Sequence, residues 1–145
     1  MLARCQCNLV RFVCPATHPL KIYVCHCTEC RHQSSSAFGI SAIFPDFDLP
    51  TEARLHVDFF TRRTLSGRYL DCYFCKHCGA RLVHRVAGGK TCSVKGGCLD
   101  ELSRDMLADK GTVVHIWTSS AVVEVPKGYQ RYEEEPDEEP AGESL

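Results

Sequence analysis

The sequence predicts a mainly β protein of antiparallel sheets with little helix. Apolar and polar residues alternate in short segments, as in residues 20–24 (LKIYV), a pattern typical of half-buried strands. Proline and glycine recur between these segments, as at Pro45, Gly88-Gly89 and Gly96-Gly97. Helical periodicity is weak throughout, so regularly punctuated short strands favour antiparallel sheets.

The elements follow from this pattern in chain order. The expected strands are residues 9–14, 20–24, 38–44, 55–59, 68–74, 81–86, 91–95, 112–117 and 121–125. In 20–24 and 55–59 the apolar side chains should face the core. Helix is expected only as one turn after Cys30 and another around residues 99–107.

Length and charge suggest one domain with an acidic tail. The 145 residues suit a single domain, which we place at residues 1–132. The last fourteen residues contain seven of the eighteen acidic residues and no Lys or Arg, so residues 133–145 are expected to be a disordered tail. Residues 1–131 then carry 17 basic and 11 acidic residues, a net charge of +6.

This basic body could attract anionic small molecules. Lys and Arg form no block and are not interleaved with an aromatic stripe, so nucleic acid is not an expected partner. No stretch is long and apolar enough to predict a membrane span.

Eleven cysteines require an explanation, and metal binding fits better than disulfides. The N-terminus shows no apolar run typical of a secretory signal. An odd cysteine count, clustered as CxC and CxxC, suits thiolates kept reduced in the cytoplasm or the nucleus.

Two cysteine pairs predict a closed tetrathiolate zinc site. Cys5 and Cys7 can face one side of an extended strand, and Cys75 and Cys78 form a CxxC turn that Gly79 allows the chain to leave. Such a site would join segments some seventy residues apart. The alternative is that each pair consists of small buried apolar residues.

A third cluster offers one ligand too few for a closed site. Cys25, Cys27 and Cys30 combine CxC and CxxC, and a zinc bound by three thiolates keeps a position for chemistry. One alternative is a metal-free redox trio. The other is a closed site with a fourth ligand from a histidine, Cys72, Cys92 or Cys98.

The remaining candidates for metal binding receive simpler interpretations. Cys14, Cys72, Cys92 and Cys98 stand singly, so core packing is their expected role. His26 and His77 lie inside the cysteine clusters, but neighbouring thiolates already satisfy the spacing. Both are expected to be exposed loop histidines.

These motifs give the chain a family resemblance. It resembles the glutathione-dependent formaldehyde-activating enzymes, a family that also includes the centromere protein V domain. The resemblance runs from about Arg4 to Tyr132, with all seven clustered cysteines in order. Its other anchors are Val10-Arg11-Phe12, residues 33–39 (QSSSAFG), Gly79-Ala80-Arg81-Leu82, Gly97-Cys98-Leu99-Asp100 and His115-Ile116-Trp117.

The resemblance implies a β-tent and up to two Zn²⁺ ions per chain. The structural zinc would bind Cys5, Cys7, Cys75 and Cys78, and the second would bind Cys25, Cys27 and Cys30. Two positions depart from the family pattern: Asn8 follows CxC, and Ser35 stands in the stretch where the family has QSGS. Asn tolerates a left-handed turn, so the first change should leave the fold intact.

The activity implied is reversible formation of S-hydroxymethylglutathione from glutathione and formaldehyde, which makes the protein a carbon-sulfur lyase. Cys25, Cys27 and Cys30 would carry the chemistry. Candidates for holding a substrate carboxylate are Arg31, Lys95 and the backbone around Gly96 and Gly97. Asp100 and His115 are candidates for proton transfer, with structural roles as their alternative.

Three other functions stay open at this point. The pocket could act on another small-molecule adduct. The chain could be a non-enzymatic interaction module like centromere protein V, although its acidic end disfavours this. A methionine sulfoxide reductase also uses paired CxxC zinc clips, but it does not need the Cys25, Cys27 and Cys30 cluster.

Overall fold

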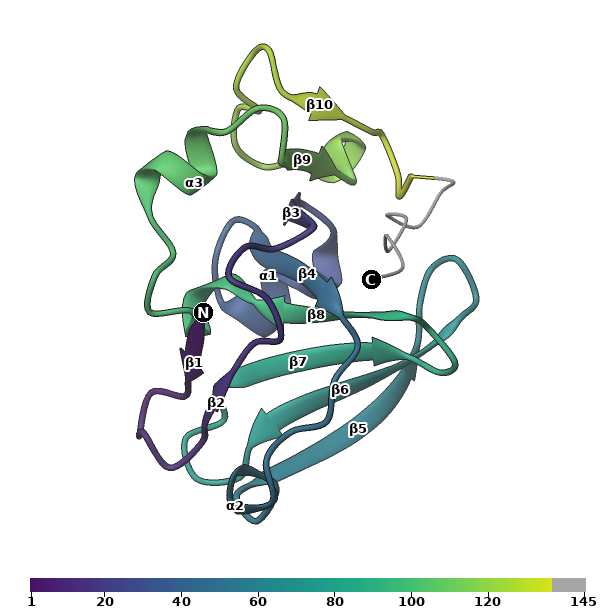
Figure 1. The fold of residues 1–145 in the computed structure, drawn as a ribbon. Coiled ribbons are helices and arrows are strands. Elements are labelled where there is room, and N and C mark those ends of the chain that lie inside the picture. The colour runs from purple at the N-terminus through teal and green to yellow at the C-terminus, as the bar shows by residue number, and fades with distance from the viewer. Residues whose placement is uncertain (137–145) are drawn as a thin grey trace.

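The computed structural model describes residues 1–136, and most of its strands belong to one large sheet. That sheet has eight strands in the order β10-β9-β3-β4-β8-β7-β6-β5, and β1 and β2 form a separate hairpin (Figure 1). The strands are β1 (Leu2–Arg4), β2 (Arg11–Val13), β3 (Lys21–Cys25), β4 (Gly39–Pro45), β5 (Val57–Arg63), β6 (Tyr69–Cys75), β7 (Arg81–Val86), β8 (Thr91–Lys95), β9 (Val113–Ile116) and β10 (Gln130–Arg131).

Helices are short and connect successive strands. They are α1 (Thr28–Ser34), α2 (Thr51–Arg54) and α3 (Arg104–Ala108), with 3₁₀ turns η1 (Gly96–Cys98) and η2 (Thr118–Ser120). The mainly β fold predicted from the sequence is confirmed. The sheet is mixed, however, because β9 pairs in parallel with both β3 and β10 while all other neighbours are antiparallel.

The two faces of the central strands have different roles. Side chains alternate between faces along a strand. Ala42, Phe44 and Val94 point to one face and join the main core beneath the β1–β2 hairpin, which contributes Ala3 and Phe12. The opposite face carries the intervening residues, including Ser41 and Ser93, and lines the cavity described below. A second core of Ile22, Val24 and Val113 lies at the β3–β9 end.

Three features differ from the sequence prediction. Residues 121–125 are not a strand, because both edges of β9 are already paired with β3 and β10. Of the apolar residues in 55–59, only Val57 packs against the main core: Leu55 is 67% exposed beyond α2, and Phe59 is 51% exposed on edge strand β5. The short elements β1, β10 and α2 lacked a pattern long enough to predict.

The acidic segment begins with residues that contact the body. Backbone amides of Trp117, Thr118 and Ser119 donate to the carbonyl oxygens of Glu134, Tyr132 and Glu133 at 3.0, 3.1 and 3.4 Å. Glu135 forms an ion pair with Arg68. The rest of the predicted tail, residues 137–145, lies outside the described residues.

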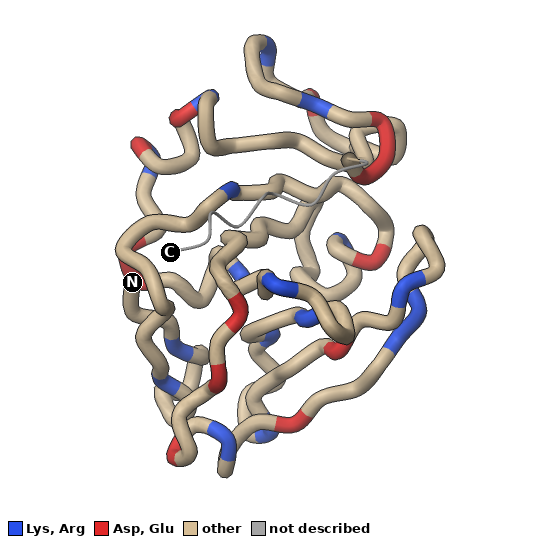
Figure 2. The backbone as a smooth tube through the Cα atoms, turned by 45° about the vertical axis from the view of Figure 1, so that its right-hand side comes forward, with Lys and Arg blue, Asp and Glu red and all other residues tan. Residues whose placement is uncertain are grey.

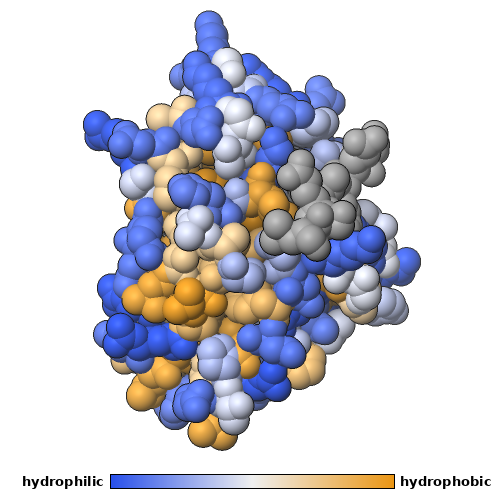
Figure 3. All heavy atoms as spheres, viewed as in Figure 1, coloured by the Kyte–Doolittle hydropathy of each residue, from blue (hydrophilic) through white to orange (hydrophobic). Residues whose placement is uncertain are grey.

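The surface mixes charge and apolar area. Figure 2 shows basic and acidic residues interspersed along the chain. Apolar surface is visible in the lower half of Figure 3, where the β1–β2 hairpin and α2 lie. Exposed apolar residues in or next to these elements are Leu9, Val13 and Leu55. Within residues 1–136, no helix has the length and apolar character needed to cross a bilayer.

Candidate functional site

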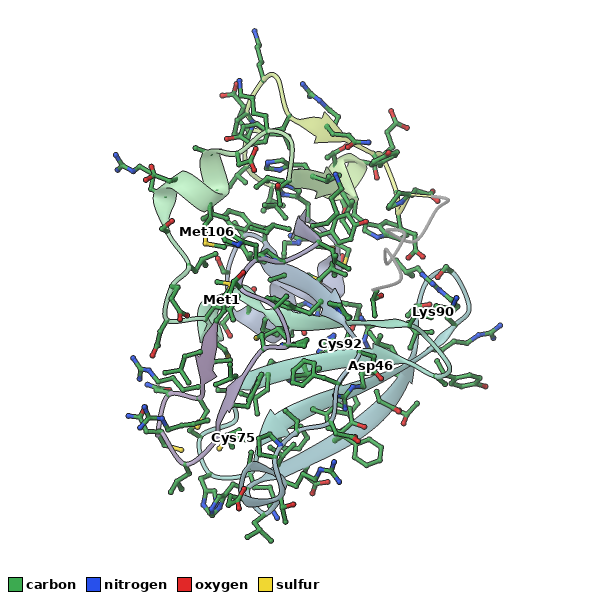
Figure 4. All side chains as sticks on the ribbon, viewed as in Figure 1. Met1, Asp46, Cys75, Lys90, Cys92 and Met106 are labelled. Carbon is green, nitrogen blue, oxygen red and sulfur yellow. The ribbon has the colours of Figure 1, made fainter. Side chains whose placement is uncertain are left out.

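Four cysteine sulfurs converge where the N-terminal hairpin meets the end of β6. The Sγ atoms of Cys5, Cys7, Cys75 and Cys78 all lie within 4.8 Å of one another. Cys7 Sγ is 3.4 Å from Cys5 Sγ and 3.7 Å from Cys75 Sγ. Tetrahedral zinc with bonds of about 2.3 Å spaces its sulfurs by about 3.8 Å, so this cluster fits the ion. Cys75 is labelled in Figure 4, at the foot of the hairpin.

Local backbone geometry supports this cluster. Asn8 follows Cys7 with φ 64°, the left-handed conformation that asparagine tolerates. The turn directs the amide of Val10 back to Cys5 Sγ at 3.3 Å. Gly79 has φ 72° directly after Cys78, as the predicted CxxC turn requires.

The second cluster gathers three sulfurs from adjoining elements. Cys25 ends β3, Cys27 caps α1, and Cys30 lies in the first turn of α1. All three are buried, with their Sγ atoms within 4.8 Å of one another. The Cys25 thiol donates to Cys27 Sγ at 3.4 Å, and the Cys30 amide donates to the same sulfur at 3.3 Å.

These contacts make the trio a fitting metal ligand set. Hydrogen bonds from the Cys25 and Cys30 thiols, with backbone amides, lower the pKa of Cys27 to about 2. The same thiol contacts and burial raise the pKa of Cys25 well above its usual value. Without a cation, the cluster therefore favours one thiolate held by protonated neighbours. Only a bound cation would favour all three thiolates at once.

Among residues 1–136, no fourth Cys, His, Asp or Glu atom joins this group. In particular Cys72, Cys92 and Cys98 are buried in other surroundings, as predicted for core residues. Cys98, for example, donates to the Arg81 carbonyl oxygen at 2.9 Å.

The prediction for His26 is wrong, whereas His77 is exposed as expected. His26 is only 1% exposed, because its ring packs against Phe38 and His115. Its Nε2 lies 3.0 Å from Nδ1 of His115, so the buried pair satisfies one nitrogen of each ring.

A cavity of about 220 Å³ is lined by all three cysteines of the trio. A larger hollow of about 510 Å³ shares His84, Ser93 and Arg68 with it and reaches residues 134–136. Ile116 and Trp117 add apolar wall beside the cysteines. The two hollows together are large enough for a small-molecule substrate.

The sheet side of this cavity is polar. Cross-strand register pairs Ser41 with Lys95 and His84 with Ser93, and the twofold repeat of a strand puts Ser93 and Lys95 on one face. Lys95 Nζ donates to Ser41 Oγ at 3.0 Å and to Ser93 Oγ at 3.3 Å. Arg62 also lines the cavity.

Only one of the residues predicted to hold a substrate carboxylate lines this cavity, namely Lys95. Arg31 lies on α1 and donates to Thr28 Oγ1 at 3.3 Å. Gly96 is buried where a Cβ would lie 2.5 Å from Ile40 Cγ2, which gives this glycine a packing role. Gly97 is exposed on η1, away from the lining residues.

The two candidates for proton transfer also lie elsewhere. Asp100 accepts a hydrogen bond from Arg4 Nε at 2.6 Å near the first cluster. His115 is paired with His26 and does not line the cavity. The contacts of Asp100 and His115 therefore fit the structural roles that were the alternative to proton transfer.

Sequence reasoning missed Ser41, Arg62, His84 and Ser93 as cavity residues. The alternation in 91–95 could have shown that Ser93 shares a face with Lys95. The other three required the register between strands, which no local pattern specifies.

Comparison with known proteins decides the family. The profile described as "Glutathione-dependent formaldehyde-activating enzyme" matches residues 1–120. The chain belongs to this family. Membership supports a function related to glutathione and formaldehyde, and the two cysteine clusters could hold metal ions.

A solved structure shares the fold of this family member. The crystal structure of a Rhodobacter sphaeroides protein superposes with a TM-score of 0.57 at 19% identity. The match covers 75% of this chain and 96% of that one. Among curated proteins, no relative matches the chain.

Proposed function

We propose that this protein is a zinc-dependent carbon-sulfur lyase that reversibly joins a thiol to an aldehyde. Glutathione and formaldehyde, giving S-hydroxymethylglutathione, are the pair that family membership supports. The observation that carries the proposal is the cavity itself: three buried cysteines with no fourth ligand among residues 1–136 line it together with Lys95 and Arg62.

The two cysteine clusters have different roles in this proposal. Cys5, Cys7, Cys75 and Cys78 hold a structural zinc that joins the N-terminal hairpin to the sheet. Cys25, Cys27 and Cys30 hold the second. A zinc ion held by these three cysteines would act as a Lewis acid, able to stabilise a substrate thiolate or polarise a carbonyl oxygen.

The reaction needs no other reactant. A carbon-sulfur bond forms between the thiol sulfur and the aldehyde carbon, the carbonyl π bond breaks, and the thiol proton is transferred to the former carbonyl oxygen. The cavity brings the two small reactants together, which removes much of the entropic cost of their encounter. Ile116 and Trp117 pack against the cysteines and make this side of the cavity apolar.

Exchange spectroscopy by NMR tests the activity. Zinc-loaded protein is added to glutathione and formaldehyde, and exchange between free and adduct signals is measured. We expect faster exchange than with the Cys27→Ser variant. Equal exchange rates, with the variant folded and its first zinc retained, would refute the lyase proposal.

A further inference from the structure

One wall of the cavity contains a buried nitrogen atom with no partner. His84 is 5% exposed, and its Nε2 makes no hydrogen bond within the described part of the chain. The same residue lines both hollows. A buried polar atom without a partner is costly, so a group that enters this cavity and pairs with His84 gains stability from that contact.

The groups around His84 favour an anion. Lys95 lies on the neighbouring strand β8 and lines the same cavity, with only hydroxyl partners, Ser41 and Ser93. Arg62, also in the lining, donates to the Arg63 carbonyl oxygen. Neither cation has a carboxylate partner among residues 1–136.

Two carboxylates do line the cavity, but their positions leave this wall cationic. Glu135 is paired with Arg68. Glu29 lies in the first turn of α1, on the cysteine side. The groups acting electrostatically on His84 are Lys95, Arg81 and Arg62, all of them positive. Burial lowers the pKa of Lys95, and the thiols of Cys30, Cys25 and Cys72 act on it in the opposite direction. An anionic ligand at this wall would give Lys95 a carboxylate partner and would pair with the buried Nε2 of His84.

We propose that His84 and Lys95, supported by Ser41 and Ser93, form a subsite for a carboxylate of the substrate. The enzyme then acts on thiols that also carry a carboxylate. This inference rests on the proposed function, because it places the substrate thiol at Cys25, Cys27 and Cys30 and its carboxylate at the polar wall. The contact is a charge-assisted hydrogen bond from Lys95 and a second bond from His84.

A matched pair of small thiols tests the subsite. 3-Mercaptopropionate and 3-mercaptopropionamide have nearly the same size and the same thiol, but only the first is anionic. Titration calorimetry measures both dissociation constants with zinc-loaded protein in the absence of formaldehyde. Any contribution from the thiol itself is common to both ligands, so the ratio reports the carboxylate.

For the wild type we expect the carboxylate to bind about ten- to a hundredfold more tightly than the amide. Lys95→Gln and His84→Leu should each move this ratio toward one while leaving the affinity for the amide nearly unchanged. Lys90→Gln removes a charge at an exposed turn of the same β7–β8 hairpin and should keep the wild-type ratio (Figure 4).

Equal affinity of the wild type for both thiols, or no detectable binding of either, would overturn the subsite. So would an unchanged ratio in both variants. If His84→Leu fails to fold, Lys95→Gln decides the question alone. The lyase proposal is judged separately. If the protein prefers the carboxylate ligand but does not accelerate exchange in the NMR experiment, only the proposed reaction is refuted. If it accelerates exchange but binds both thiols equally, only the subsite is refuted.

Discussion

Gly39 and Cys30 lie so close that a Cβ on Gly39 would be 3.1 Å from Cβ of Cys30. The same added atom would be 3.6 Å from Cys30 Sγ. The first residue of β4 thus presses against the α1 turn that carries two of the three cysteines. The positions of Cys25, Cys27 and Cys30 therefore depend on residue 39 being a glycine, which has no side chain.

Gly39→Ala should therefore weaken metal binding at the trio and leave the first cluster loaded. Overpacking of this kind costs about 1–3 kcal/mol. Metal content per chain after dialysis against a weak chelator measures the effect. Gly97→Ala is the matched control, because its Cβ would meet nothing within 4 Å. Full retention of the second metal by Gly39→Ala would contradict this account.

Ser35→Gly should stabilise the protein. Ser35 ends α1 with φ 51°, a left-handed conformation that costs a residue with a Cβ roughly 1–2 kcal/mol. Glycine removes this strain while keeping the backbone hydrogen bonds to Arg31 and His32. We expect the free energy of unfolding to rise by about 1 kcal/mol in urea denaturation. Ser36→Gly, one residue later, should give no such gain, and equal effects of the two substitutions would refute the explanation.

His84 should make the protein less stable in acid. Burial, followed by the charge of Lys95, lowers the pKa of His84. The folded state keeps it neutral, whereas the unfolded chain takes up a proton below about pH 6.5. The unfolded state then binds more protons than the folded state. The contribution of neutral His84 to the free energy of unfolding is therefore complete above about pH 6.5 and decreases as the pH drops below it.

The His84→Gln variant isolates this contribution. Between pH 7.5 and 5.5 it should lose about 1 kcal/mol less unfolding free energy than the wild type. His18→Gln changes an exposed histidine and should follow the wild type. Parallel stability curves for wild type and His84→Gln would show that His84 is protonated in the folded state.

Local patterns were most successful in predicting the β7–β8 hairpin. Residues 81–86 and 91–95 are strands with the bounds expected, since alternation and the Gly88-Gly89 turn act over a few residues. Residues 121–125 have the same local pattern, but both edges of the preceding strand β9 are occupied by β3 and β10. Whether residues 121–125 could pair with β9 depended on the places of β3 and β10 in the sheet. This is a non-local property that the sequence pattern of one segment does not contain.

The site shows the same division between local and non-local information. Spacing grouped Cys25, Cys27 and Cys30 correctly, because six residues contain the whole cluster. The opposite wall combines Ser41, His84 and Lys95 from three strands whose register is set by packing. Sequence reasoning therefore found the cysteine clusters that could hold a metal, but only one residue of the polar wall.

Metal content by mass spectrometry tests the central claim most directly, namely that four cysteines stabilise the fold and three serve a reactive site. Structural zinc contributes on the order of 10 kcal/mol, comparable with the whole stability of a domain. We predict up to two zinc ions in the wild type, one in a folded and soluble Cys25→Ser variant, and loss of soluble protein for Cys75→Ser. Equal structural damage from both substitutions would contradict the division of roles.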